Sequence, residues 1–527
     1  MKKLFALLLA VIMVLSMAAC GAETPAEPQE TLGKTYEELE RVEAGNETVA
    51  VDETTKFKEE LIIGIDAALV TLNPAENNST AGGEYDMVAY DRLLYYNEDT
   101  AEFEPELATE WTWIDNKTLE LKLRDDVTFS DGSKFTADDV VYSLGILKNG
   151  TGTKANFTTF ESAEAIDATT VRVYLNTVNV DFLFPLSTFS SVIMSKSACE
   201  ADPEKGYYVT TGAYIVEDFV PSDYVTLKVN ENYWGEVPVT QKMTFRYIPE
   251  ASARLIALQN GELDVCLRVS EEDAGFAQED PNVELTIIPT NTVIYFAFDT
   301  SEGPGADENL RLALAHCLKK DDIIAAAANG YGKVAVSNWG YRTYGYDDSF
   351  GDYPYDLELA KQYLEKAEYK EITAIVRGTK TRDVNALTVV QEQARQIGLT
   401  VNIEGIEAAD LSERTQFQNH FHEAVVYSYG WVSYGDVCRN PYYKDSNANK
   451  ANLTNQEIMD LIDAAAQETD DVKRKEMYAK IQLLNHEHAY YLPMFYSVVF
   501  QGVNKDVAGV VWGSLTMDFT YAARPIA

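Results

Sequence analysis

The stretch "PELATEWTWIDNKTLELKLRDDVTFSDGSKFTADDVVYSL", residues 105–144, decides the fold. Its middle part, "TLELKLRDDVTFS", alternates apolar and polar residues, which is typical of a strand with one buried face. The segment after it opens with Thr136 as a helix N-cap and Asp139 three residues later, and Phe135 and Val140 have the spacing of a hydrophobic staple. The stretch therefore predicts a strand that leads through a turn into a capped helix.

The first half of the chain adds further strands and one clear helix. "LIIGIDA" at 61–67 and "TVRVYLNT" at 170–177 have strand character. "ASARLIALQNGELDV" at 251–265 predicts a helix that ends at Gly261 and leads into a strand, because glycine favours the backbone conformation found just after a helix.

The second half of the chain has a different pattern of predicted helices and strands. "EITAIVRG" at 371–378, a helix in "RDVNALTVVQEQARQIG" and a strand in "LTVNIEGIE" together predict a β–α–β unit. Thr454 and Glu457 predict a capping box at the start of "TNQEIMDLIDAAAQ". The tail, from "YYLPMFYSVVFQGV" onward, returns to strands.

This order of strand-rich, mixed helix–strand and again strand-rich segments predicts an α/β protein with two lobes. Lobe I is expected at 58–288, lobe II at 289–494, and a return of residues 495–527 to lobe I. The chain would then cross between lobes twice, near 288–293 and near 490–497. A double connection of this kind behaves as a hinge, and a cleft lies beneath it.

The 105–144 stretch resembles the signature region of the family 5 solute-binding proteins of ABC importers, the receptors for peptides, dipeptides and nickel. The resemblance implies a large periplasmic-binding-protein-like fold with a hinge and an extra subdomain in lobe I. It also implies a permease as partner, a small solute as ligand and no catalysis. Further matching segments follow in order: "TTGAYIVEDF", "YIPEASARLIALQNGELDV", "NLRLALAHCLKKDDII", "YDLELAKQYLEKA" and "NQEIMDLIDAAAQETDDVKRKEMYAKIQLLNHEHAYYLPMF".

The first residues have the pattern of an export signal. Basic residues precede an apolar run that is too short to span a bilayer, and small residues lead to Cys20. "SMAAC" resembles a bacterial lipobox, in which the cysteine becomes the lipid-modified N-terminus. We therefore expect a signal peptide at 1–19, a membrane anchor on Cys20 and a disordered, acid-rich tether at 20–57. The mature protein would be held on the outer face of the cell membrane.

Composition limits the partners further. With 84 acidic against 43 basic residues, the formal net charge is −41, which makes nucleic acid and anionic lipid headgroups implausible partners. Cys266 and Cys317 lie in apolar patterns and are expected to be buried, while a disulfide between Cys199 and Cys438 stays open. We expect a monomer.

The strongest candidate for the ligand site is "YSYGWVSYGDVCRNP", residues 427–441. Tyr429 and Trp431 would share one face of a strand, and Trp431 and Tyr434 could stack on an extended ligand. Core packing is the alternative for the tyrosines. By resemblance, peptide-binding relatives carry an aspartate where this chain has Tyr434, so Asp436 is the nearby carboxylate that could pair with a peptide's amine, or else cap a turn.

Candidates in lobe I come from two segments. "NSTAGGEYDM" corresponds by resemblance to a loop over the ligand and offers Glu84 and Tyr85, although Glu84 in a plain exposed loop is the alternative. "FPLSTFSSV" offers Phe189, Ser190 and Ser191 at the cleft wall.

No catalytic residue, cofactor or metal site is predicted. The histidine pairs in "NHFHEAV" and "NHEHAY" lack a third ligand, and there is no G-x-S-x-G motif or phosphate loop. We therefore predict a receptor that captures a short peptide by hinge closure. The alternatives are an oligosaccharide or other organic solute, a nickel chelate, an extracytoplasmic hydrolase, and a tethered sensor or adhesin.

Overall fold

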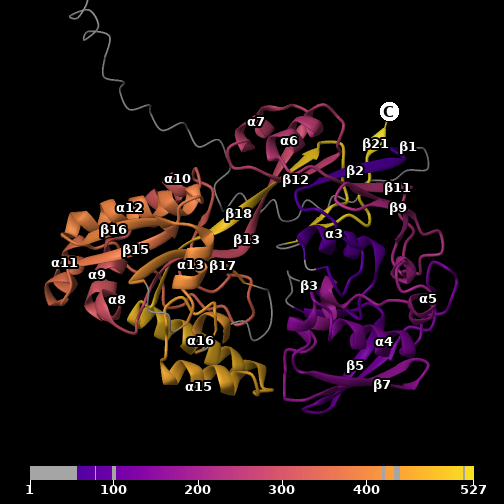
Figure 1. Ribbon diagram of the computed structural model, residues 1–527, viewed down its shortest axis with the longest axis horizontal. Coiled ribbons are helices and arrows are strands. Elements are labelled where there is room, and N and C mark those ends of the chain that lie inside the picture. The colour runs from indigo at the N-terminus through magenta and orange to yellow at the C-terminus, as the bar shows by residue number, and fades with distance from the viewer. Residues whose placement is uncertain are drawn as a thin grey trace, which may run out of the picture.

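The computed structural model has two lobes side by side, joined by strands that run from one into the other (Figure 1). It describes residues 56–77, 79–97, 102–417, 422–431, 439–444, 446–513 and 517–526. The predicted signal peptide, Cys20 and the tether up to residue 55 lie outside these residues, as do Tyr434, Asp436 and Cys438. Within the described residues, no helix has the length and apolar character needed to cross a membrane.

The largest sheet passes through both lobes, and all but one of its strands lie on one path. The exception, β14 (Lys333–Val334), pairs with β18. In spatial order the path is β16 (Thr400–Ile406), β15 (Glu371–Arg377), β17 (Ala424–Gly430), β13 (Val283–Phe298), β18 (Tyr491–Asn504), β12 (Val265–Val269), β2 (Glu60–Ile65), β11 (Lys242–Tyr247), β10 (Tyr224–Val229) and β9 (Tyr214–Val220).

The long strands β13 and β18 connect the lobes as an antiparallel pair, seen crossing the middle of Figure 1. Their register shifts between the pair Pro289–Val498 and the pair Val293–Tyr496. At this shift the Thr290 hydroxyl donates to the carbonyl oxygen of Ser497 at 2.9 Å. We call residues 290–292 and Ser497 the crossover.

Apolar packing separates the lobes at the same place. Ile288, together with β2 and β9–β12, belongs to clusters on one side of the crossover, whereas Ile294 and Phe495 belong to a cluster on the other. We therefore use lobe I for residues 56–289 and 498–526, and lobe II for 293–496. Lys56–Phe57 (β1) already pairs with Pro525–Ile526 (β21), so these two residues of the predicted tether are part of the folded body. Backbone pairing of this kind needs no apolar pattern and leaves little trace in the sequence.

Residues 105–144 fold as predicted within lobe I. Thr118–Leu123 (β6) is a strand, and Thr136 is the N-cap of Ala137–Leu147 (α4). The Asp139 carboxylate accepts the Thr136 backbone N–H at 2.9 Å. The subdomain sheet beside α4 has the order β5 (Ala108–Asp115), β6, β8 (Thr170–Leu175) and β7 (Phe160–Asp167).

The predicted β–α–β unit is confirmed, because β15 and β16 are parallel and Thr381–Ile397 (α12) connects them. The helix before Gly261 is confirmed as Ala251–Gln259 (α6). The capping box at Thr454 is wrong by one residue. Asn455 is the N-cap of Gln456–Ala465 (α15), and its side chain accepts the Ile458 N–H at 3.1 Å.

Cys199, Cys266 and Cys317 are buried free thiols.

The remaining helices cover the sheet in both lobes. Other helices are α3 (Thr80–Ala89), α5 (Lys196–Ala201), α7 (Ala274–Glu279), α8 (Gly303–Ala306), α9 (Glu308–Cys317), α10 (Lys320–Ala327), α11 (Leu357–Lys366), α13 (Ala408–Arg414), α14 (Arg439–Tyr442) and α16 (Asp471–His488). Short strands are β3 (Leu94–Asn97), β4 (Glu102–Pro105), β19 (Val511–Trp512) and β20 (Met517–Asp518).

Candidate functional site

The carboxyl ends of strands from both lobes meet at the crossover. In lobe I, β2 and β12 are parallel and point toward it, since Val269 at the end of β12 pairs with Phe500, three residues from Ser497. In lobe II, β17 runs toward it from the other side, and Gly430 at its end pairs with Thr292. Ligands of open α/β sheets bind outside the carboxyl ends of the strands, so this edge is the candidate site.

Trp431 lies at the centre of the lobe II side of this edge. It follows β17 directly, and its backbone N–H donates to the Asn291 carbonyl oxygen at 3.2 Å. Its ring stacks on Trp339 with centroids 5.0 Å apart and meets the edge of Tyr429 at 5.3 Å. Trp431 is only 1% exposed, so its ring lies within packed aromatic side chains rather than on an open surface.

Three N–H groups around Trp431 are buried and have no hydrogen-bond partner among the described residues. They are Asn291 Nδ2, Trp339 Nε1 and Trp431 Nε1. The other end of the Asn291 amide is held, because its Oδ1 accepts the Arg342 N–H at 2.9 Å. Leaving a buried donor unpaired costs about 1–3 kcal/mol, and such groups are uncommon away from ligand or water sites. All three are donors, so their complement is an acceptor oxygen.

Positive charge gathers beside β17 at the same edge. Lys380 Nζ donates to the Ser428 hydroxyl at 2.9 Å and lies 3.1 Å from Asp383 Oδ2. Arg382 donates to the other oxygen of Asp383 at 2.9 Å, so two cations share one carboxylate. Burial and the neighbouring Arg382 lower the pKa of Lys380. Across the crossover, burial raises the pKa of Glu271, and Arg382 opposes this rise.

On the lobe I side, Arg268 joins two carboxylates. Its Nη1 lies 2.8 Å from Asp66 Oδ1, and its Nη2 lies 2.7 Å from Glu84 Oε1. Glu84 is fully buried, and burial raises its pKa to about 7 in spite of the arginine. Arg268 has a positive φ of 54°, a conformation that costs free energy in a non-glycine residue and that often occurs at functional sites.

The structure corrects the expectation for the Glu84 segment. Residues 80–89 form α3 rather than a loop, with Ser79 as N-cap, and Glu84 is not exposed. Tyr85 is fully buried in the core of lobe I, with its ring 6.2 Å from that of Tyr90. A helix there satisfies the backbone polar groups that a buried loop would leave unpaired.

Phe189 and Ser190 lie in a single 3-10 turn, Phe189–Ser191 (η4), that contacts α3 and α4 in lobe I. Phe189 is half-buried and Ser190 is buried. Tyr434 and Asp436 follow Trp431 but lie outside the described residues, so only Tyr429 and Trp431 of the predicted lobe II set can be placed at the crossover.

Sequence reasoning missed several residues of this edge. Trp339 lies in "SNWGYRTYGYDD", whose density of aromatic residues and glycines was the available signal. Asn291, Arg268 and the Lys380–Arg382 pair carry no local pattern, because they come together only when distant strands align.

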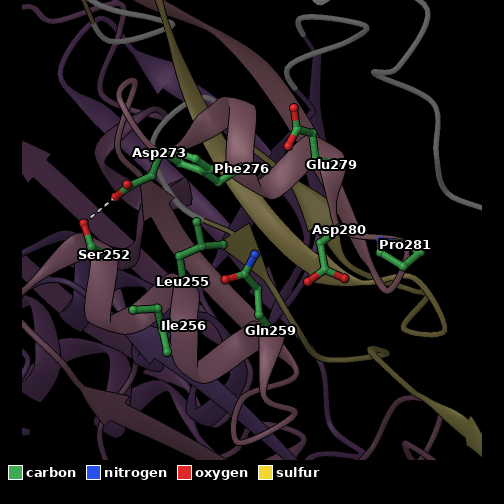
Figure 2. A pocket seen from close by; sticks show the side chains of 9 residues that line it. All are labelled: Ser252, Leu255, Ile256, Gln259, Asp273, Phe276, Glu279, Asp280 and Pro281. Carbon is green, nitrogen blue, oxygen red and sulfur yellow. Dashed lines mark hydrogen bonds between the residues drawn. The ribbon is translucent and has the colours of Figure 1, made fainter.

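Other features of the described residues do not form a competing site. No group of three or more histidine, cysteine, aspartate or glutamate side chains gathers there as metal ligands. A groove of about 540 Å³ lies between α6 and α7, lined by Ile256 and Phe276 among others (Figure 2). All its lining residues belong to lobe I, so a molecule in this groove would not touch both lobes.

Comparison with known protein families identifies one that matches this chain. The family "Bacterial extracellular solute-binding proteins, family 5 Middle" matches residues 102–450, more than half of the 527 residues. The chain belongs to this family. It is therefore a solute-binding protein of an ABC importer, working outside the cytoplasm with permease subunits, and it binds its solute without transforming it.

Individual relatives extend the match over most of the solute-binding protein. Heme-binding protein A of Haemophilus influenzae is 27% identical over 501 residues, which cover 87% of this chain and 90% of that protein. The dipeptide-binding protein of Escherichia coli is 26% identical over 477 residues, covering 82% and 88%. The solved structure of HbpA2 from Haemophilus parasuis superposes with a TM-score of 0.80 at 24% identity, covering 89% and 100%. Solutes across the family include peptides, heme, glutathione and nickel.

Proposed function

We propose that this receptor carries a short peptide, held at the crossover between the lobes. The observation that carries the proposal is the set of buried donors Asn291 Nδ2, Trp339 Nε1 and Trp431 Nε1, none of which has a hydrogen-bond partner in the described part of the chain. Main-chain carbonyl oxygens of a peptide are acceptors that can satisfy donors of this kind, and an extended peptide presents them at regular intervals. The dipeptide-binding protein of Escherichia coli among the relatives supports the same solute class.

The cations beside β17 fit the charged end of such a solute. Lys380 and Arg382 flank the carboxylate of Asp383 and place positive charge beside β17, while Glu271 of lobe I interacts with Arg382 from across the crossover. A peptide's terminal carboxylate would pair with this charge, and the hydrogen bonds would be charge-assisted. Asp436 is the proposed partner for the peptide's amine, and Tyr434 a proposed wall of the pocket.

Capture would work by closure of the lobes about the crossover. A solute that touches both lobes binds the closed form more tightly, so it shifts the open–closed equilibrium toward the closed form. Phe189 and Ser190 would form the lobe I side, with Glu84 acting through Arg268 and Tyr85 supporting the turn at Phe189–Ser191 from the core behind it. The closed form would deliver the peptide to the permease while the lipid on Cys20 holds the receptor at the membrane.

Calorimetry on the purified protein tests the solute class. Pools of di- to hexapeptides should give saturable binding, and glutathione, hemin and the nickel–histidine complex serve as the comparison solutes. Saturable binding of hemin or nickel–histidine without binding of any peptide pool would contradict the proposal.

Two variants test the residues. Trp431→Phe keeps a stacked ring but removes the Nε1 donor, so peptide affinity should fall about tenfold with little change in stability. Lys380→Met should weaken the binding of peptides with a free carboxylate but not of their C-terminal amides. Lys361 is a half-exposed lysine of α11 that pairs with Glu358, and Lys361→Met should change neither affinity. If the affinities for a peptide with a free carboxylate and for its C-terminal amide fell equally, Lys380 would not be the group that binds the carboxylate.

A further inference from the structure

A buried ion pair crosses between the lobes. Arg474 Nη1, from α16 of lobe II, lies 2.7 Å from Asp181 Oδ1 of lobe I. The two side chains are only 7% and 5% exposed. In Figure 1, α16 occupies the end of lobe II that lies away from the β13–β18 crossing. Packed rings connect this contact to the crossover, because Tyr344 packs on Tyr478, Tyr478 on Trp339 and Trp339 on Trp431.

Each partner is held firmly by its own lobe. In lobe II, Arg474 Nε donates to the Tyr344 hydroxyl at 3.0 Å, and the guanidinium lies 4.4 Å from the centre of the Tyr344 ring. In lobe I, the Asp181 N–H donates to Asn179 Oδ1 at 3.0 Å, and the next residue, Phe182, is buried and stacks on Phe160 of the subdomain sheet. The pair thus joins two rigid parts.

Aromatic side chains of both lobes pack together next to Tyr344, the ring that holds Arg474. Tyr96 of lobe I is buried in the same apolar cluster as Trp339, Tyr344 and Tyr478 of lobe II. Phe184, three residues after Asp181, meets the Tyr96 ring edge-on at 5.6 Å. When the lobes separate, this surface and both charges become exposed to solvent.

We propose that Arg474 and Asp181 form a latch that stabilises the closed arrangement of the lobes before any solute binds. A charge that is buried without its partner is strongly unfavourable, whereas the open form hydrates both groups. Arg474→Met therefore disfavours the closed form more than Asp181→Asn does, because it leaves Asp181 buried without this cation, whereas in Asp181→Asn the guanidinium keeps Asp471 of its own helix at 3.6 Å. The proposal rests on closure of the lobes but not on the identity of the solute.

Distances between the lobes test the latch without a solute. Spin labels attached at positions 138 and 460, exposed in α4 and α15, report the separation by double electron–electron resonance. Arg474→Met should raise the ratio of open to closed molecules about tenfold or more, and Asp181→Asn should raise it by a smaller factor because Arg474 keeps Asp471. Arg395→Met removes an exposed ion pair of α12 in lobe II and should leave the ratio unchanged.

The double variant decides whether the two residues act together. If they form one latch, adding Asp181→Asn to Arg474→Met should recover part of the closed population, because the double variant leaves no uncompensated charge of this pair between the lobes, whereas independent effects would add. Unchanged distances in the single variants, or additive changes in the double variant, would overturn the latch. Circular dichroism verifies that each variant is folded. The distance measurements contain no solute, so they test the latch alone. The calorimetry tests the peptide proposal independently.

Discussion

Arg268 and Arg474 each hold one carboxylate that water hardly reaches, Glu84 and Asp181, but the two arginines differ in what they connect. Arg268 and its partners Glu84 and Asp66 all belong to lobe I, so this network exists whenever the lobe is folded. Arg474 and Asp181 belong to different lobes, so their contact exists only when the lobes meet. The same chemistry should therefore govern stability in the first case and conformation in the second.

The largest effect should come from removing Arg268. Arg268→Met leaves Glu84 buried without its cation, and we expect a loss of about 3–5 kcal/mol in the free energy of unfolding, measured by urea denaturation. Arg172→Met, which removes a more exposed pair with Glu120, should cost at most about 1 kcal/mol. A loss no greater than that of Arg172→Met would mean that Glu84 is already neutral.

The Arg268 effect should depend on pH in a defined direction. Burial raises the folded-state pKa of Glu84 from 4.5 to about 7, so the folded protein binds more protons than the unfolded chain between these values. Its contribution to stability is therefore present at low pH and is lost as pH rises through this window. Without Arg268 the pKa rises further, so the deficit of the variant should be smaller at pH 5 than at pH 8.

Lys450 extends the comparison to a buried cation held without a carboxylate among the residues that the structure describes. Its ammonium donates to the Thr415 hydroxyl at 3.0 Å and lies 4.9 Å from the Tyr427 ring, and burial lowers its pKa from 10.5 to about 8. The unfolded chain binds more protons between these values, so stability should rise with pH across this window. Lys450→Met should abolish that rise and increase stability at pH 7 by about 1–3 kcal/mol, as measured by urea denaturation at pH 7 and at pH 10.

Asp139 is a buried carboxylate held by backbone N–H groups, and no cation pairs with it among the residues described. Its two oxygens accept the N–H groups of Thr136 and Lys196, each at 2.9 Å, and so join the starts of α4 and α5. Asp139→Ala should cost about 1–2 kcal/mol in thermal or urea unfolding. Asp139→Asn keeps an acceptor oxygen and should recover part of this loss.

The smallest effect on unfolding should come from Arg474, which sharpens the contrast with Arg268. In Arg474→Met the lobes can separate and hydrate Asp181, so urea denaturation should show a loss below about 1 kcal/mol. A loss as large as that of Arg268→Met would mean that the two lobes unfold as one unit and that Asp181 belongs to a common core.

Local patterns predicted much of the fold because each local preference agreed with the tertiary structure. The alternation in 118–123, the cap at Thr136 and the β–α–β unit around α12 are examples. The cap of α15 was misplaced because Thr454 and Asn455 are both good capping residues. Only the backbone geometry, in which Asn455 accepts the Ile458 N–H, distinguishes them.

The candidate site was harder to predict, since it forms where distant segments meet. The alternation of residues along one strand predicted that Tyr429 and Trp431 lie on the same face. Trp339 and Asn291, which contact Trp431, come from other parts of the chain. Glu84 was expected near a ligand loop. Its burial in a helix follows from packing against Arg268, which a pattern of neighbouring residues does not reveal.

The hydrogen-bonded pairing of β13 with β18 limits how this molecule can deform. Two paired strands resist sliding past each other but twist readily about their common direction. Relative motion of the lobes should therefore be torsional, with the outermost strands β16 and β9 travelling farthest. The backbone amides of Ile294 and Phe296 would then exchange slowly with deuterium in every state of the receptor, even when the outermost strands of the two lobes move over large distances.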